Sequence, residues 1–137
     1  MNQQEIFLVR NSFRQVLPIT DQTAALFYAR LFELDPSLRP LFRGDMREQG
    51  RKLMRFLGTA VGRLDRLDDL LPGVRALGVR HASYGVQYKH YAAIGTALLW
   101  TLGKGLGPEF TEEVREAWNT VYATLAGTMI EASKTAA

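Results

Sequence analysis

Residues 72–91 read PGVRALGVRHASYGVQYKHY, and this stretch holds both histidines of a chain of 137 residues. Proline suits the first position of a helix, so a short helix is expected to open at Pro72. Val74, Leu77 and His81 are three and four residues apart, which places them on one face of that helix. A histidine on an apolar face is more often a satisfied core residue than a metal ligand, and both interpretations stay open at this point.

Three further amphipathic segments precede this stretch, each with a stripe of residues at steps of three and four. The first segment ends at Pro18, and Thr20 is the expected N-cap of the second, which Pro36 interrupts. A tight helical corner is then expected to end at Phe42, before a third helix begins at about Asp45. The stripes are Ile6, Val9, Phe13, Val16 and Leu17; Ala24, Phe27, Tyr28, Leu31 and Phe32; and Gln49, Leu53, Phe56, Leu57, Ala60 and Leu64.

The segments after residue 64 are expected to alternate between loose and helical structure. Residues 65–71 are predicted to form a looser link, and Gly85 to end the helix that follows it. The glycines within 103–107 are expected to end the next helix, and Thr111 to cap the last one. The stripes of these two helices are Tyr91, Ile94, Leu98 and Leu102, and Val114, Trp118, Val121, Leu125 and Met129.

The fold class that follows is all-α, in one domain that spans residues 1–137. No window of comparable length alternates with a period of two, so strands are not expected. A corner and a short helix interrupt the long segments, which excludes a simple up-and-down bundle. The third helix contains Gly58 and Gly62, whose cost of about 1 kcal/mol each suggests that another backbone passes close to them.

The composition excludes several classes of function. The chain has no cysteine, which rules out disulfides, thiolate metal sites and cysteine nucleophiles. Its net charge is +3, but the 17 basic residues are spread among 14 acidic ones without a basic run, so no nucleic-acid partner is expected. A secretory signal and a stretch of about 18 apolar residues are both missing, which predicts a cytoplasmic protein without membrane insertion.

Six short motifs are spread along nearly the whole chain. They are LFYARLF at 26–32, DPSLRPLF at 35–42, EQGRKLM at 48–54, RHASYGV at 80–86, HY at 90–91 and AWNTVY at 117–122. Each motif is a weak signal alone. In this order, the six together resemble the single-domain bacterial globins, in particular those similar to the globin domain of flavohaemoglobins. The resemblance implies a globin fold packed around haem b, which is iron protoporphyrin IX.

The resemblance also implies a role for each candidate site residue. His81 is the proximal iron ligand, and Phe42 is the corner aromatic that stacks on the porphyrin. Tyr28, Gln49 and Leu53 form the distal pocket, where the first two donate hydrogen bonds to bound oxygen. Independently of the family, Gln49 and Leu53 are four residues apart and face the same way. The other residues implied to contact the cofactor are Lys52, Leu57, Leu77, Arg80, Val86 and Tyr91.

Several of these residues have a plainer alternative. On spacing alone, Tyr28 is a core tyrosine whose hydroxyl bonds to a backbone carbonyl. Lys52 and Arg80 are placed to reach a haem propionate, but they fit ordinary solvated charges equally well. His90, the second histidine, is interpreted as structural.

The proximal network departs from the family pattern. An imidazole that binds iron through one nitrogen is expected to donate a hydrogen bond from the other to a carbonyl or hydroxyl. Tyr91, ten residues after His81, is implied to support this side. Relatives of the flavohaemoglobin type also place a glutamate late in the last helix, where this chain has Ser133. Glu131 lies two residues earlier, a helical turn of about 200°, so a peroxidase-like electronic push is not expected.

The implied function is reversible binding of oxygen and other diatomic gases such as nitric oxide. Nitric oxide dioxygenation is the associated activity, in which Tyr28 and Gln49 are the candidate catalytic residues. Each turnover needs an electron, and 137 residues leave no room for flavin or nicotinamide sites, so a separate reductase is the expected partner. The alternatives are a haem-based gas sensor or partner-binding globin, and a haem-free globin fold used only for protein contacts.

Overall fold

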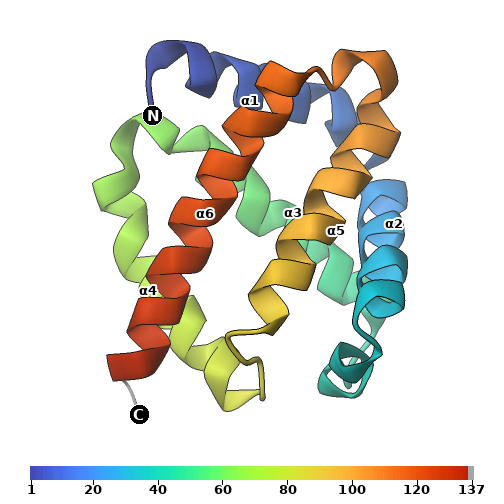
Figure 1. Ribbon diagram of the computed structural model, residues 1–137, viewed down its shortest axis with the longest axis vertical. Helices are drawn as coiled ribbons and strands as arrows, with labels where there is room; N and C mark the ends of the chain where they lie inside the picture. The colour runs from blue at the N-terminus through green and yellow to red at the C-terminus, as the bar shows by residue number, and fades with distance from the viewer. Residues whose placement is uncertain (136–137) are drawn as a thin grey trace.

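The computed structural model describes residues 1–135, which are built from helices without any strand (Figure 1). This architecture confirms the predicted all-α class. The α-helices are α1 (Gln3–Val16), α2 (Thr20–Leu34), α3 (Met46–Gly62), α4 (Leu67–Ser83), α5 (His90–Leu106) and α6 (Glu112–Thr135), and the 3-10 turns are η1 (Leu17–Ile19), η2 (Pro36–Leu41), η3 (Leu64–Arg66) and η4 (Gly107–Glu109).

The helices fall into two packing groups. α6 packs mainly against α4 and α1, while α2 packs mainly against α5 and α3. α3 crosses behind α5 and α6 in Figure 1 and rests on α2 and α1. α3 and α4 therefore belong to different groups, although only η3 separates them in the chain.

The predicted stripes form one apolar core between these groups. Trp118 is 1% exposed, and its indole nitrogen donates a hydrogen bond to the Ser12 hydroxyl at 2.8 Å, which ties α6 to α1. Leu17 is an exception, because α1 ends before it and leaves its side chain 49% exposed in η1. Within residues 1–135, no helix joins the length to the apolar character that crossing a membrane requires.

The two predicted N-caps have different outcomes. Thr111 caps α6 as expected, because its hydroxyl accepts a hydrogen bond from the Val114 amide at 3.3 Å. Thr20 is not a cap but the first residue of α2, with helical backbone angles. The turn η1 leads directly into α2, so Thr20 already has the conformation that an N-cap residue lacks.

The looser link predicted over residues 65–71 is wrong. η3 and the start of α4 occupy that segment, and Pro72 lies inside α4 rather than opening it. The missing amide of Pro72 costs the helix one hydrogen bond. In compensation, Asp68 and Asp69 lie in the first turn, where negative charge favours the helix dipole. Leu70 is buried, so tertiary packing also holds this turn in the helix.

α5 continues through two of the glycines that were predicted to end it. Gly103 and Gly105 are helical, with the Phe110 ring packed over the first and the Val16 side chain over the second. The helix ends just before Gly107, which adopts a positive φ of 59°. Only the third glycine therefore acts as the predicted terminator.

The backbone approach predicted at two glycines of α3 is also wrong. Gly58 faces the ring of Phe13, at 3.7 Å from the position of a Cβ atom, and Gly62 has no atom within 4 Å of that position. Close approaches between helices lie instead at Gly50 and Gly78. Both of these glycines adjoin residues of the candidate site.

Candidate functional site

The inner face of α2 forms an aromatic cluster around Tyr28. Tyr28 is 8% exposed, and the ring of Phe27 lies edge-on to it with centres 5.0 Å apart. Phe42, which ends η2 as predicted, lies edge-on to the same ring at 5.4 Å. Phe32 stacks on Tyr28 at 6.1 Å. These contacts hold the tyrosine ring in one place inside the protein.

Gln49 on α3 is the polar neighbour of Tyr28. Burial raises the pKa of Tyr28 to about 12, while its hydrogen bond with the Gln49 side chain acts in the opposite direction. The hydroxyl is therefore protonated at neutral pH and available as a hydrogen-bond donor. The structure thus brings together the two residues that were predicted to share the distal pocket.

A close crossing of α2 and α3 places Gln49 beside Tyr28. A Cβ atom at Gly50 would lie 2.8 Å from the Cβ atom of Ala24, a distance that real side chains do not show. Ala24 is one turn before Tyr28, and Gly50 directly follows Gln49, so this crossing sets the spacing of the pair. Gly50 was not predicted, since the pattern within one helix does not reveal what another helix brings against it.

The other distal candidates lie along α3. Leu53 is half-buried and Leu57 is buried, and both pack against the core. Lys52 is exposed, and none of the ion pairs within residues 1–135 involves it. The structure therefore places the two leucines against the core and the lysine at the surface, where both interpretations of Lys52 put it.

His81 lies near the end of α4 and is half-buried. This helix ends in a Schellman motif, in which the Gly85 amide donates to the Ala82 carbonyl at 3.1 Å and the Val86 amide to the His81 carbonyl at 3.0 Å. Gly85 has a φ of 100°, which favours glycine. The predicted end of the helix at Gly85 is confirmed, and the motif fixes the backbone of His81.

One ring nitrogen of His81 has no partner. Nδ1 is buried and makes no hydrogen bond to any described residue, so the predicted second-nitrogen hydrogen bond is absent at this atom. Burial lowers the pKa of His81, and the charge of Arg80 lowers it further. The ring is therefore neutral at pH 7, which is the form that binds metals. Arg80 itself is exposed, which fits both a role beside a haem propionate and an ordinary solvated charge.

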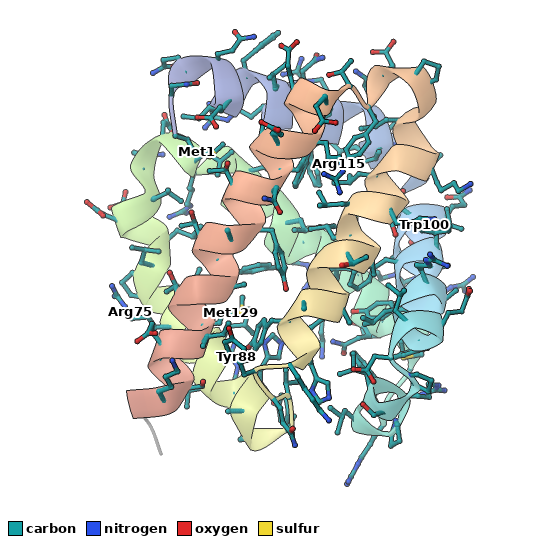
Figure 2. All side chains as sticks on the ribbon, viewed as in Figure 1. Met1, Arg75, Tyr88, Trp100, Arg115 and Met129 are labelled. Carbon is teal, nitrogen blue, oxygen red and sulfur yellow. The ribbon has the colours of Figure 1, made fainter. Side chains whose placement is uncertain are left out.

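A second close crossing positions the helix that carries His81. A Cβ atom at Gly78 would lie 2.5 Å from the Met129 carbonyl oxygen and 2.6 Å from the Met129 Cα atom. α4 and α6 thus meet backbone to backbone near the labelled Met129, about one turn before His81 (Figure 2). Leu77 and Val86, the other candidates on this side, are half-buried against the core.

Tyr91 lies at the start of α5 and is 8% exposed. Its hydroxyl is directed at the Met129 sulfur at 4.0 Å, a weak acceptor. Its carbonyl accepts a hydrogen bond from the Tyr122 hydroxyl at 2.5 Å. Tyr91 is therefore held mainly through its backbone and by packing.

No carboxylate completes the network around Tyr91 among residues 1–135. The Ser133 hydroxyl donates to the Ile130 carbonyl at 2.7 Å, inside its own helix. Glu131 pairs with Lys134 at 3.5 Å on the surface. These positions agree with the expectation that Glu131 does not take the place of the family glutamate.

His90 joins the start of α5 to the corner η2. It is 3% exposed, and its Nδ1 accepts a hydrogen bond from the Gln87 amide at 2.9 Å. Its Nε2 lies 3.4 Å from the Ser37 hydroxyl and 4.0 Å from the Asp35 carboxylate. Both ring nitrogens thus have local partners, which supports the structural interpretation of this histidine.

These features define an all-α protein with one neutral histidine on α4, and with a buried tyrosine on α2 that bonds with a half-buried glutamine on α3. The sequence model for globins matches residues 25–129. The chain therefore belongs to the globin family.

Individual relatives agree with this assignment. Neuroglobin from Danio rerio is 32% identical over 136 residues, which cover 89% of this chain and 86% of that protein. The flavohemoprotein of Bordetella parapertussis is 33% identical over 107 residues, which cover 76% of this chain but 27% of that protein. An engineered carbene transferase, made from a candidate nitric oxide dioxygenase of Rhodothermus marinus, superposes with a TM-score of 0.88 at 28% identity over 99% of this chain and 95% of that one. The predicted likeness to the flavohaemoglobin globin domain is confirmed.

Proposed function

We propose that this chain binds haem b through His81 and takes up oxygen and other diatomic gases, including nitric oxide, beside Tyr28 and Gln49. One arrangement carries the proposal: a neutral imidazole with a buried, unpartnered nitrogen lies on α4, and the buried Tyr28 hydroxyl on α2 bonds with the half-buried Gln49 amide on α3. Membership of the globin family supports both haem and gas binding.

The side chains on the two packing groups suit a flat, largely apolar prosthetic group. A single histidine ligand is how globins hold haem iron, and the buried Nδ1 atom of His81 costs stability while it lacks a partner. The Phe42 ring is available for stacking, and Lys52 and Arg80 are exposed cations available to the propionates. The proposed apolar lining consists of Leu53, Leu57, Leu77 and Val86, with Tyr91 supporting His81 through packing.

Haem supplies reversible gas binding and one-electron chemistry when it is bound. Tyr28 keeps its proton and donates a hydrogen bond to a polar ligand, and the Gln49 amide is a second donor. A hydrogen bond to a partly charged ligand contributes about 1.5–3 kcal/mol, which slows dissociation roughly ten- to a hundredfold. Leu53 keeps water away from these donors, so their interaction with the ligand is not screened.

We extend the proposal to nitric oxide dioxygenation, with nitrate as the product. The likeness to a flavohemoprotein supports this activity, as does the superposition on a structure derived from a candidate nitric oxide dioxygenase. The chain spans about a quarter of the flavohemoprotein it matches. Electron supply by a separate reductase is part of the same proposal. The cytoplasmic location expected from the sequence belongs to the same proposal.

Absorption spectra of the ferric, ferrous and oxygenated forms test the haem proposal. A Soret band that shifts with each form is expected after haem is added, and its complete absence would leave only a haem-free role. Nitric oxide is then added to the oxygenated form, and rapid consumption with equal formation of nitrate is expected. Oxygen binding without that consumption would contradict dioxygenation, and a change in affinity for a cellular partner on ligation would then favour a gas sensor.

A further inference from the structure

Positive charge is concentrated in and around α3. Residues 39–66 contain eight basic and three acidic residues, a net charge of +5, although the whole chain carries only +3. The remaining residues contain nine basic and eleven acidic residues, a net charge of −2. The first turns of α6 are acidic, with Glu112, Glu113 and Glu116. Eight of the 17 basic residues therefore belong to α3 and the segments that flank it.

Three arginines form a stripe along α3. Arg47, Arg51 and Arg55 are four residues apart and exposed, and we call them the α3 basic stripe. Like charges at this spacing repel one another. Arg51 has Glu48 as a partner at 3.5 Å, but none of the ion pairs within residues 1–135 involves Arg47 or Arg55. Because this repulsion destabilises α3, the stability of the fold does not explain why the three arginines are there.

The stripe lies on the helix that also carries the distal residues. Gln49 and Leu53 are on the inner side of α3, while the stripe is on its outer side, so one helix diameter of about 10 Å separates the two. α3 rests on α2 and α1 and lies behind α5 and α6 in Figure 1. The three arginines of the stripe are exposed, so this outer face is open to solvent. A protein docked on the stripe would therefore approach the candidate haem site closely.

We propose that the α3 basic stripe docks the acidic surface of a separate electron-donating flavoprotein. This inference rests on the proposed function, because it names the surface that the reductase uses. One electron would pass from the flavin hydroquinone to ferric iron, leaving a flavin semiquinone and ferrous iron, with no bond made or broken. Weak electron-transfer complexes use small interfaces, and opposite charges steer their partners together. Such binding weakens steeply with salt.

The test compares two charge-reversal variants of the haem-loaded chain. Arg47→Glu/Arg55→Glu alters the stripe, and Arg75→Glu/Arg115→Glu makes the same change of charge at exposed arginines on α4 and α6 (Figure 2). The probe is oxidised flavodoxin, a small acidic flavin protein, and the readout is its dissociation constant, which needs no turnover. The stripe variant is expected to bind at least about tenfold more weakly, and the control within about twofold of the original chain.

Further measurements separate this inference from the proposed function. Binding of flavodoxin to the original chain is expected to weaken as the salt concentration rises from about 20 to 300 mM. Reduction of the haem iron by photoreduced flavodoxin is expected to become slower over the same range. Reduction by photoreduced lumiflavin, a small flavin that carries no protein charge, should be unaffected in both variants. If lumiflavin also fails to reduce the original chain, the proposed function is at fault, whereas equal losses in the two variants would reject the stripe.

Other partners for the stripe are part of the same test. Binding to a DNA duplex or to phosphatidylserine vesicles that disappears in the stripe variant, with flavodoxin binding unchanged, would overturn the proposal. Should the double reversal impair folding, Arg47→Gln/Arg55→Gln is measured instead. A smaller loss of flavodoxin binding is then expected, and no loss in a correctly folded variant would contradict the inference.

Discussion

The two sides of the candidate site differ in whether their polar atoms have hydrogen-bond partners. On the Tyr28 side, the buried Tyr28 hydroxyl and the half-buried Gln49 side chain bond with each other, and the Phe42 ring packs on the tyrosine, so the two polar groups are positioned by the protein alone. On the His81 side, the ring keeps a buried nitrogen that no described residue satisfies. The difference teaches that this fold positions the polar groups of the proposed gas-binding side in advance, and leaves a nitrogen without a partner on the proposed metal-binding side. Each side is set by one glycine crossing, at Gly50 and at Gly78.

The largest effect on stability is expected at the crossing on the His81 side. Gly78→Ala places a methyl group against the Met129 backbone, which cannot rotate away, and should destabilise the fold by about 1–3 kcal/mol. Gly50→Ala meets one methyl group and should cost less. Gly62→Ala is the control, because no atom lies within 4 Å of the added methyl group. This substitution should stabilise the fold by up to about 1 kcal/mol. Urea unfolding measures all three, and similar values for Gly78→Ala and Gly62→Ala would refute the crossing.

The next effect concerns the preordered side. Tyr28→Phe keeps the aromatic packing but removes the hydroxyl donor, so oxygen should dissociate roughly ten- to a hundredfold faster. Stopped-flow displacement by carbon monoxide gives this rate. Tyr88→Phe, at a residue that is 73% exposed, is the matched control and should leave the rate unchanged. An unchanged rate in the Tyr28 variant as well would remove this hydroxyl from the ligand site.

A smaller effect is expected at alkaline pH. Burial raises the pKa of Tyr28 to about 12, so the unfolded chain loses this proton first and stability falls as the pH rises from 10 towards 12. Burial also raises the pKa of Tyr91 and Tyr122. Between pH 8 and pH 11, the free energy of unfolding of Tyr28→Phe should therefore fall by about 1 kcal/mol less than that of the original chain. Part of the fall should remain because of the other two tyrosines. Urea midpoints between pH 8 and 12 provide the measurement, and identical slopes in the two chains would count against the buried hydroxyl.

The smallest effect is expected at Tyr91. Its hydroxyl meets only a weak sulfur acceptor in Met129, at 4.0 Å among the described residues. Tyr91→Phe should therefore change unfolding by less than about 0.5 kcal/mol and leave the spectra nearly unchanged. Tyr122→Phe removes the hydrogen bond to the Tyr91 carbonyl and should cost more. A large spectral change in Tyr91→Phe would show that this hydroxyl acts on His81 after all.

Periodicity within each helix predicted much of the distal side. Phe27, Tyr28 and Leu31 are spaced so that they share one face, and that face is buried. The end of η2 at Phe42 was also predictable, because prolines and glycine bracket the corner. Local sequence rules predicted the helix boundaries less well. Pro72 was expected to start a helix, but α4 already begins at Leu67, because the packing of Leu70 holds the residues before the proline in the helix.

What the sequence could not reveal is how one helix meets another. Gly50 and Gly78 look no different in the sequence from Gly58 and Gly62, and only the opposing helix decides which glycine is required. The pairing state of His81 was likewise unpredictable, since it depends on groups brought near by other segments. The assignment of His81 to iron came from the order of six motifs and not from its spacing.

The central claim is that the His81 imidazole is the protein ligand of haem iron. The most direct measurement is haem titration of His81→Gly with and without added imidazole, followed by absorption spectroscopy, with His90→Gln as the control. The account predicts that His81→Gly loses the histidine-ligated spectrum and regains it with imidazole, whereas His90→Gln keeps it. An unaltered spectrum in His81→Gly without imidazole would contradict the account.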